Sequence, residues 1–383
     1  MINQEQRMKK LIRAVTVPQS LGLVEALLPK LKQKYEAQLL SSPGDRIDKI
    51  SKEHQVVGHR VEMYRRMSPF KDLKSLFQLI KVFRKEKPYM VHSMTPKAGL
   101  LCMLAAWLTR VPRRVHTFTG LVWPTASGLS RRILMFTDWV TCACATHVIP
   151  EGQGVLDDLQ QHITKKTMKV LGYGNVMGID MNRFSRRPEI EAKAKELVKD
   201  NVYTFVFVGR LVKDKGINEL VEAFTKLYDK YTNVRLLLVG KYEAELDPLK
   251  QETLDSINAL PAIEAVGSQY GDDLLAHYAA SDCFVFPSYR EGFPNTVIEA
   301  GAMGLPSIVT DINGAREIII HGENGVIIPS KDADAIYQAM EQMMLDKEKA
   351  KAMADNARPL IASRFEQSFV HKCLLDFYEE IIG

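Results

Sequence analysis

The sequence predicts a two-domain α/β protein in which each domain is built on a parallel sheet. The chain has 383 residues, too many for one ordinary core. Short runs rich in Val, Leu and Ile alternate with longer stretches of helical periodicity. This alternation is typical of parallel strands joined by right-handed helical crossovers. The scheme occurs twice, once on each side of a glycine-rich segment at 172–178.

The expected strands are the short apolar runs of each half. In the first half they are Leu11–Val17, Ala37–Leu40, Arg60–Tyr64, Tyr89–Ser93, Val115–Thr119, Ala145–Ile149 and Met168–Leu171. In the second half they are Thr204–Val208, Arg235–Val239, Ile263–Val266, Cys283–Phe286, Ser307–Thr310 and Gly325–Ile328. Helices are expected between them, as at Asp72–Lys85, Ala98–Leu108 and Ile217–Tyr228.

The glycine-rich segment predicts the domain boundary. Three glycines in seven residues, at 172, 174 and 178, interrupt any helix or strand and favour a hinge. We expect an N-terminal domain at 1–175 and a C-terminal domain at 176–365. The last helix, at 366–383, is expected to pack back toward the N-terminal domain.

The composition is that of a soluble globular protein, and we expect a cytoplasmic location. It is 46% hydrophobic and 25% charged, and it has no run of 18 apolar residues that could span a membrane. The first residues lack the apolar core and small-residue cleavage site of a signal peptide. Five scattered cysteines argue against a disulfide framework. Cys142 and Cys144 are expected on one face of a strand, as small buried residues.

The two halves differ in charge. Residues 1–170 carry 28 Lys and Arg against 13 Asp and Glu, whereas residues 171–383 carry 23 against 33. A basic half predicts an anionic partner, unless the charge has merely drifted between two solvated surfaces. RNA binding is disfavoured because no aromatic platforms are interleaved with the cations. An anionic membrane surface is favoured because Phe70, Leu73, Phe77 and Leu129 lie among the basic residues. Those basic residues are Arg65, Arg66, Lys71, Lys74, Lys81, Arg84, Lys85, Arg113, Arg114, Arg131 and Arg132.

The strongest chemical signal is the string at 291–299, which reads Glu-Gly-Phe-Pro-Asn-Thr-Val-Ile-Glu. It follows an expected strand and opens an expected helix, with Pro294 suited to the first helical turn. The free amides at such a helix start, those of Asn295, Thr296 and Val297, predict an anion site at the carboxyl edge of a sheet. A diphosphate fits such a site, with Glu291 and Glu299 placed to accept from sugar and ribose hydroxyls.

A second signal lies at 207–216, Phe-Val-Gly-Arg-Leu-Val-Lys-Asp-Lys-Gly. Gly209 allows close backbone approach, and Arg210 and Lys215 place two cations beside a helix start. The segment matches neither the phosphate loop of nucleotide hydrolases nor the dinucleotide fingerprint. Diphosphate binding together with the 291–299 string is therefore favoured over ATP hydrolysis and nicotinamide chemistry.

Three motifs together resemble glycosyltransferase family 4. They are FVGRLVKDKG, SYREGFPNTVIEAGAMGLP and TDINGAREIIIHGENGVII, in that order along the chain. The first half, with SPFKDLKSLFQLIKVFRKEKPYMVHSMTPKAGLL and RRVHTFTGLVW, resembles a branch that builds capsular or O-antigen polysaccharide on polyprenyl-diphosphate lipid. The resemblance implies the GT-B fold, in which two Rossmann-like domains face each other across a cleft. It also implies transfer with retained anomeric configuration.

The resemblance assigns roles to the two motifs. Arg210 and Lys215 are expected to bind the donor diphosphate, Glu291 the donor sugar, and Glu299 the ribose. A nucleotide sugar, UDP-linked by family frequency, is the expected donor, and a lipid-linked or saccharide acceptor is expected. The donor-binding residues expected are Gly209, Arg210, Lys215, Glu291, Gly292, Phe293, Pro294, Asn295, Thr296 and Glu299.

The first half departs from the family at one place. The family often has a His directly before a Gly at the end of the strand that holds its active-site His, whereas Thr119 precedes Gly120 here. His116 lies three residues earlier and points to the opposite face of a regular strand. His116 and Thr119 are therefore both catalytic candidates, with a packing role open for His116. His92, Thr95 and Lys97 are candidates on the acceptor side.

No cofactor or metal is expected. The one Asp-x-Asp string, Asp332-Ala-Asp334, lies where a helix should begin, and helix-terminal charge explains it. Two other functions are weighed: a nucleotide-sugar epimerase of the same architecture, and a non-enzymatic module that binds anionic lipid. Dependence on an acceptor distinguishes the transferase from the epimerase.

Overall fold

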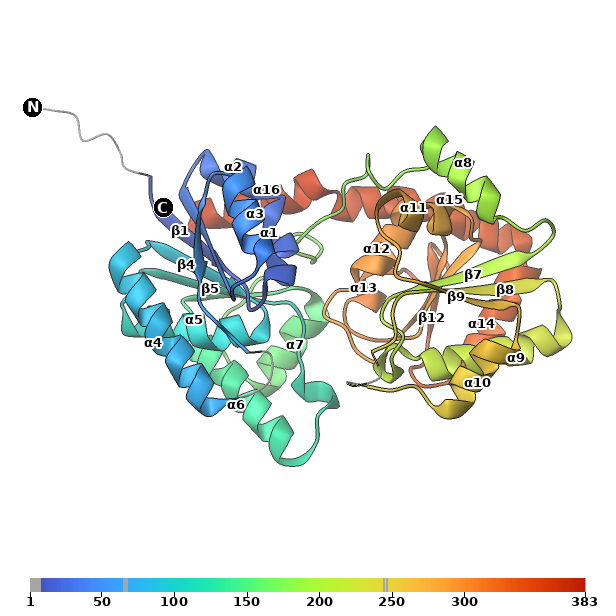
Figure 1. Cartoon of the computed structure of the whole chain (residues 1–383), viewed down its shortest axis with the longest axis horizontal. Helices are drawn as coiled ribbons and strands as arrows, with labels where there is room; N and C mark the ends of the chain where they lie inside the picture. The colour runs from blue at the N-terminus through green and yellow to red at the C-terminus, as the bar shows by residue number, and fades with distance from the viewer. Residues whose placement is uncertain (1–7, 65–67, 244, 246, 383) are drawn as a thin grey trace, which may run out of the picture. The chain divides into compact units, whose positions relative to one another are not determined.

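The chain forms two compact units. The computed structural model describes residues 8–64, 68–243, 245 and 247–382, so Arg65 and Arg66 lie outside the described residues. Unit 1 comprises Met1–Met177 and Val370–Gly383, and unit 2 comprises Gly178–Phe369 (Figure 1). The final segment of the chain is thus part of the first unit.

Unit 1 is built on a parallel sheet of six strands in the order β3-β2-β1-β4-β5-β6. The order reverses direction at β1, as in doubly wound folds, because the chain first adds strands on one side and then on the other. The strands are β1 (Lys10–Ala14), β2 (Glu36–Ser41), β3 (Val57–Arg60), β4 (Met90–Met94), β5 (Arg113–Phe118) and β6 (His147–Pro150).

Two of the strands expected in unit 1 are wrong. The third strand ends at Arg60 instead of beginning there, and Met168–Leu171 is not a strand. Val61, Met63 and Met168 are nevertheless buried in the core. Their apolar side chains report burial, which does not require strand pairing.

Helices cover both faces of this sheet. Ile12 and Val91 face the core shared with α4, α5 and α6, whereas Leu11 and Met90 face α16, as the alternation along a strand requires. The helices are η1 (Pro18–Leu21), α1 (Gly22–Glu25), α2 (Leu28–Lys32), α3 (Asp45–Glu53), α4 (Pro69–Glu86), α5 (Pro96–Leu108), η2 (Trp123–Thr125), α6 (Gly128–Cys144), α7 (Gln153–His162) and α16 (Gln367–Ile382).

Cys142 and Cys144 lie in the last turn of α6, so the expected strand position is wrong for both. They are buried, as expected of small apolar residues. Two buried positions two residues apart suit a strand, but here the end of α6 packs into the core while the chain turns into β6. Alternation over three residues is too short to separate these cases.

Unit 2 repeats the architecture with a second parallel sheet, ordered β12-β11-β10-β7-β8-β9. Its strands are β7 (Tyr203–Val208), β8 (Val234–Val239), β9 (Ile263–Gly267), β10 (Cys283–Phe286), β11 (Ser307–Thr310) and β12 (Gly325–Ile328). Its helices are α8 (Pro188–Leu197), η3 (Lys213–Lys215), α9 (Ile217–Lys230), α10 (Gln251–Ala259), α11 (Gly271–Ala279), α12 (Asn295–Ala302), α13 (Ala315–Ile318), α14 (Ala333–Leu345) and α15 (Lys347–Phe365). The six strands expected here all form.

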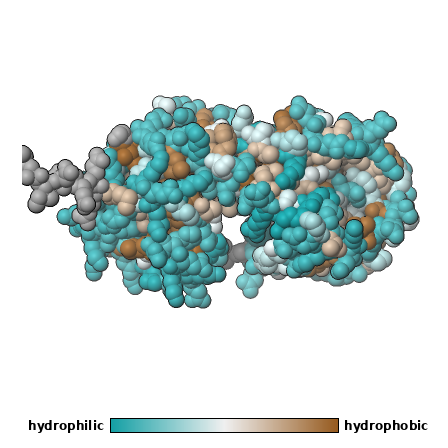
Figure 2. All heavy atoms as spheres, turned by 90° about the horizontal axis from the view of Figure 1, so that it is seen from above, coloured by the Kyte–Doolittle hydropathy of each residue, from teal (hydrophilic) through white to brown (hydrophobic). Residues whose placement is uncertain are grey.

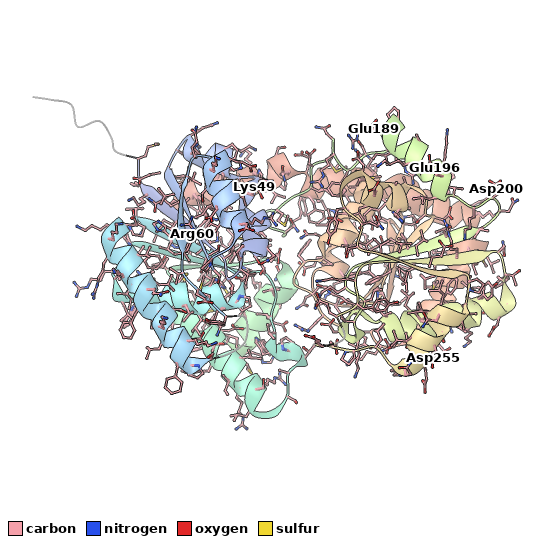
Figure 3. All side chains as sticks on the ribbon, viewed as in Figure 1. Lys49, Arg60, Glu189, Glu196, Asp200 and Asp255 are labelled. Carbon is pink, nitrogen blue, oxygen red and sulfur yellow. The ribbon has the colours of Figure 1, made fainter. Side chains whose placement is uncertain are left out.

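The surface of both units is largely hydrophilic in the view of Figure 2. Acidic side chains of unit 2 that Figure 3 labels, such as Glu189 and Glu196 on α8 and Asp255 on α10, are exposed. Lys49 and Arg60 are likewise exposed on unit 1. No helix among the described residues combines the length and apolarity that a membrane span needs.

Candidate active site

Three loops meet at the carboxyl edge of the unit 2 sheet, after the adjacent strands β7, β10 and β11. The Tyr289 amide, in the loop after β10, donates to the Asp214 carbonyl in the loop after β7 at 2.9 Å. The Ser288 hydroxyl oxygen lies 3.3 Å from the same carbonyl oxygen. These contacts hold the two loops that carry the 207–216 and 291–299 motifs against each other.

Two glycines allow the loops to come this close. Gly216 has φ +71°, and a Cβ there would lie 2.1 Å from the Pro287 carbonyl oxygen. Gly314, in the loop after β11, has φ +75°, and its Cβ would lie 2.4 Å from the Gly292 carbonyl oxygen. Both positions need a left-handed backbone and space that only glycine leaves. The loop that precedes α12 is therefore held from two sides.

Glu291 and Lys215 form an ion pair where these loops meet. Both side chains are mostly buried, at 17% and 14% exposure. The Ser288 hydroxyl donates to Glu291 Oε1 at 2.9 Å, which fixes the carboxylate from a second direction. A carboxylate and an ammonium, positioned and largely shielded from water, thus lie at the edge of the sheet.

Arg210 lies at the start of the loop after β7, and its side chain is 43% exposed. Its Nη1 donates to Glu243, in the loop after β8, at 2.9 Å. Gly209 directly follows β7, and its amide donates to the Val239 carbonyl at 2.9 Å. The guanidinium is therefore available at the same edge as Lys215, with one carboxylate partner that a stronger anion could displace.

The start of α12 differs in detail from the expectation. Pro294 is the residue that caps the helix from outside, not the first helical residue, and α12 begins at Asn295. The Val297 amide donates to the Pro294 carbonyl at 3.1 Å, so it is not available to an anion. Phe293 is buried and packs edge-on against Phe365 with ring centroids 5.5 Å apart, which anchors the loop. Thr296 is half-buried in the first turn.

Glu299 lies in the second turn of α12. The Tyr278 hydroxyl, fully buried on α11, donates to its Oε2 at 3.1 Å. Burial raises the pKa of Glu299 to about 7, although the Tyr278 hydrogen bond and the charge of Arg183 act in the opposite direction. This carboxyl therefore changes its charge near neutral pH.

His116 lies inside unit 1 and not at a surface. It is 1% exposed on β5, its Nδ1 lies 2.9 Å from the Ser93 hydroxyl, and its ring packs edge-on against Phe118. A Cβ on Gly99 of α5 would lie 2.4 Å from the imidazole. Burial lowers the pKa of His116 to about 3, so the ring is neutral. This is the packing arrangement that the sequence left open.

The acceptor-side candidates are also engaged within unit 1. His92 is buried between the Tyr378 hydroxyl of α16 and the Thr117 hydroxyl, the latter at 2.7 Å from Nε2. Thr95, at φ +72°, pairs its hydroxyl with that of Thr16 at 2.7 Å. Lys97 forms an ion pair with Asp72 at 2.6 Å.

Thr119 directly follows the end of β5 and is half-buried. His92 and His116 are enclosed, whereas Thr119 lies at the carboxyl edge of the sheet. Of the catalytic candidates in unit 1, Thr119 is therefore the one placed where a substrate could reach it.

Three residues of the candidate site were missed from the sequence. Ser288 holds Glu291, Glu243 holds Arg210, and Tyr278 holds Glu299. Only Ser288 carried a signal, because it precedes Glu291 in the same loop. Tyr278 and Glu243 are separated from their partners in sequence, so only the fold brings them together.

Asp332 caps α14 by accepting from the Ala335 amide at 2.9 Å, as helix-terminal charge predicts.

The fold defines a class: two doubly wound units, the GT-B architecture, with both sequence motifs at one sheet edge of unit 2. Residues 188–359 match the model of "Glycosyl transferases group 1", and residues 19–174 match that of "Glycosyl transferase 4-like domain". The chain belongs to this family of glycosyltransferases.

Individual relatives agree with this membership. The chain is 32% identical over 378 residues to the capsular polysaccharide biosynthesis glycosyltransferase CapM of Staphylococcus aureus, covering 98% of both chains. It is 30% identical to the UDP-Gal:alpha-D-GlcNAc-diphosphoundecaprenol alpha-1,3-galactosyltransferase of Escherichia coli, covering 79% of this chain and 78% of the relative. Anabaena Alr3699/HepE, crystallised in complex with UDP, shares the fold with a TM-score of 0.79 at 18% identity, covering 97% of this chain and all of that one.

We predict that Gly216→Ala destabilises unit 2 more than Gly304→Ala does. Both glycines have positive φ, but nothing lies within 4 Å of a Cβ at Gly304, whereas a Cβ at Gly216 meets the Pro287 carbonyl. Gly304→Ala should cost about 1–2 kcal/mol, the price of the left-handed backbone alone. Gly216→Ala should cost more, because the two motif loops must separate. Urea unfolding measures the loss of stability in each variant; equal losses would show that the loops do not need this contact.

Proposed function

We propose that this protein is a retaining glycosyltransferase that moves a sugar from a UDP-linked donor to a lipid-linked or saccharide acceptor. We place it in the synthesis of bacterial surface polysaccharide. The observation that carries the proposal is the Glu291–Lys215 pair beside Arg210 at the carboxyl edge of the unit 2 sheet. In a family of glycosyltransferases, this set combines a carboxylate for sugar hydroxyls with two cations for a diphosphate.

The reaction breaks the bond between the anomeric carbon of the sugar and the diphosphate oxygen. Negative charge grows on the leaving diphosphate, and Arg210 and Lys215 stabilise it from fixed positions. The acceptor hydroxyl forms the new bond on the same face of the sugar, and its proton passes to the leaving phosphate. Glu291 holds the sugar through its hydroxyls, which keeps the face of the anomeric carbon that carries the leaving diphosphate turned toward the acceptor.

No metal is needed in this scheme. The two cations supply the charge that a divalent ion supplies in other phosphate-transfer and sugar-transfer sites. Glu299 accepts from the ribose, and Thr119 contributes a hydroxyl to the donor sugar. His116 and His92 act through packing: they hold α5 and α16 on the sheet of unit 1.

The relatives support a lipid-linked acceptor. The Escherichia coli relative acts on a diphosphoundecaprenol-linked sugar, and a Campylobacter jejuni relative, 25% identical, acts on a diphospho-undecaprenol substrate. The crystallised Anabaena protein binds UDP. We propose the same substrate classes here and, because the acceptor stays in the membrane, a peripheral position on its cytoplasmic face.

We predict acceptor-dependent transfer that requires Glu291. With UDP-sugars and a polyprenyl-diphosphate sugar as acceptor, the wild type should release UDP and elongate the acceptor in the presence of EDTA. Glu291→Gln should lower kcat by about 100-fold or more, because the amide has no charge to pair with Lys215 and its nitrogen donates where a carboxylate oxygen accepted. Glu348→Gln, at an exposed position on α15, is the control. Formation of a new nucleotide sugar without acceptor would instead identify an epimerase.

We predict that Arg210→Ala and Lys215→Ala each weaken UDP binding while leaving uridine binding unchanged. Each removes a cation that only the diphosphate contacts, which corresponds to about 10- to 100-fold in Kd for a charged hydrogen bond. Lys213→Ala, in the same loop with its side chain exposed, is the matched control. Titration calorimetry with both ligands gives the comparison, and parallel losses for uridine and UDP would remove these residues from the diphosphate site.

We predict that donor binding strengthens as pH rises through neutrality. The pKa of Glu299 is raised to about 7 by burial, so its carboxyl is mostly protonated at pH 6 and mostly ionised at pH 8. The ionised form is the better acceptor for ribose hydroxyls. Affinity for a UDP-sugar, whose phosphates do not titrate in this range, should therefore rise by up to about tenfold from pH 6 to pH 8. Glu299→Gln should abolish the dependence; an unchanged pH profile in this variant would exclude Glu299 as its source.

A further inference from the structure

The outer side of α4, α5 and α6 exposes an unusual number of large apolar side chains. Of the 18 exposed large apolar residues among those described, nine lie on these three helices of unit 1. We call this set the apolar face: Phe70, Leu73 and Phe77 on α4, Trp107 and Leu108 on α5, and Leu129, Ile133, Phe136 and Trp139 on α6. Exposed apolar residues are common singly, but a contiguous group marks an interaction surface.

The residues of the apolar face follow helical spacing, so each helix presents them as a stripe. On α4 the spacing is three and four residues, and on α6 it is four, three and three. Phe70 is 91% exposed and Leu129 is 71% exposed, so these side chains are not part of the core. Phe136 and Trp139 stack on each other with ring centroids 5.8 Å apart. The sequence left open whether Leu73 belongs to the core, and it is half exposed here.

The two stripes belong to one surface. α4 and α6 both pack against α5, and all three helices share the core on one face of the unit 1 sheet. Between them, α5 contains no charged residue after Lys97, and its half-buried Leu100 and Leu104 continue the apolar character toward Trp107 and Leu108. All three helices begin at the carboxyl edge of the sheet, where Thr119 lies.

Exposed cations lie on two of the three helices that carry the apolar face. Seven exposed basic residues lie on α4 and α6, and none forms an ion pair with a carboxylate of the residues that the structure describes: Lys71, Lys74, Lys81, Arg84, Lys85, Arg131 and Arg132. The acidic residues of the same helices have their charge either paired with another cation or reduced by burial. Asp72 is paired with Lys97 and Glu86 with Lys10, and burial raises the pKa of Asp138 to about 7.

Other cations of the basic half do not contribute to this surface. Arg113 donates to the Ile381 carbonyl, and Arg114 donates to the carbonyls of Cys144 and Val111 at 2.6 and 2.8 Å. They hold the chain at the amino edge of the sheet. The overall charge of the first half is therefore a weaker guide to docking than the cations on the helices that carry exposed aromatic residues.

We propose that the apolar face of α4, α5 and α6 docks on a bilayer leaflet that contains anionic lipid, with its aromatic side chains inserted between the headgroups. Exposed Trp, Phe and Leu on the same helices as Lys and Arg that form no ion pair with a described carboxylate match an interfacial surface, because apolar insertion and lipid headgroup charge act together. A protein partner is disfavoured because its surface would have to combine acidic residues with apolar residues that match the stripes on two separate helices. The inference rests on the proposed function only in that a membrane-held acceptor would meet the enzyme at this surface.

The test uses the full chain and vesicles of phosphatidylcholine with or without phosphatidylglycerol. The wild type should co-sediment with anionic vesicles, less so at high salt. Phe136→Ser combined with Trp139→Ser, and Phe70→Ser combined with Phe77→Ser, should each lower vesicle partition by about tenfold or more. Lys74→Glu and Arg131→Glu should each lower it about fivefold or more at low salt. Leu345→Ser on α14 of unit 2 and Lys52→Glu on α3, both at exposed positions away from the apolar face, should bind like the wild type.

Depth is measured separately by quenching with brominated acyl chains. Trp107 and Trp139 are half exposed on the apolar face, whereas Trp123 is 2% exposed, so quenching should largely disappear in Trp107→Phe combined with Trp139→Phe. Urea unfolding of every variant shows whether unit 1 is still folded, and UDP calorimetry shows whether the donor site of unit 2 is intact, which separates failure of docking from failure of the proposed function.

Three results would overturn the proposal. The first is partition of the apolar and charge variants equal to that of the wild type, and the second is absence of wild-type binding to anionic vesicles. The third is concentration-dependent self-association in ultracentrifugation that Phe136→Ser with Trp139→Ser abolishes, because the face would then be an interface between copies of this chain.

Discussion

The contact between the loops after β7 and β10 is the constraint on which the candidate site depends. Lys215 and Glu291 are 76 residues apart in the chain, and they pair because Gly216 lets the first loop lie directly on the Pro287 carbonyl. Gly314 allows the same close approach from the loop after β11. Two charges of opposite sign are thereby held at one sheet edge, largely out of water, where each interacts more strongly with a charged ligand than it would in solvent.

The ion pair also suggests how the site responds to its ligand. In this structure Lys215 and Arg210 are each satisfied by a carboxylate, Glu291 and Glu243. A diphosphate carries more charge than one carboxylate and can draw both cations toward itself. Glu291 would then be released to accept from the donor sugar. Under the proposed function the same side chains pair with one another and also bind the donor, so that no buried charge is left unpaired.

Unit 1 shows a different use of polar residues. Arg13 is 1% exposed and donates to the Tyr378 hydroxyl at 2.7 Å, and that hydroxyl also contacts His92. Burial lowers the pKa of His92 well below its usual value, with Arg13 and His116 adding to the effect. The ring is therefore neutral and can link Tyr378 to Thr117. This network holds the end of the chain on the first sheet, whereas the outer helices of the same unit leave apolar side chains exposed.

The sequence alone predicted the α/β class and the parallel sheets, and it singled out Arg210, Lys215, Glu291 and Glu299 as candidate site residues, because periodicity and motifs are local properties of the chain. Local patterns failed at Met168–Leu171 and at Cys142 and Cys144, where apolar residues are buried without forming a strand. A short run of apolar residues looks the same in the sequence whether it lies in a strand, a helix end or a loop. Only the tertiary structure decided that His116 is enclosed under α5 and that Tyr278 supports Glu299. These roles depend on which residues distant in sequence come together, and no local signal carries that information.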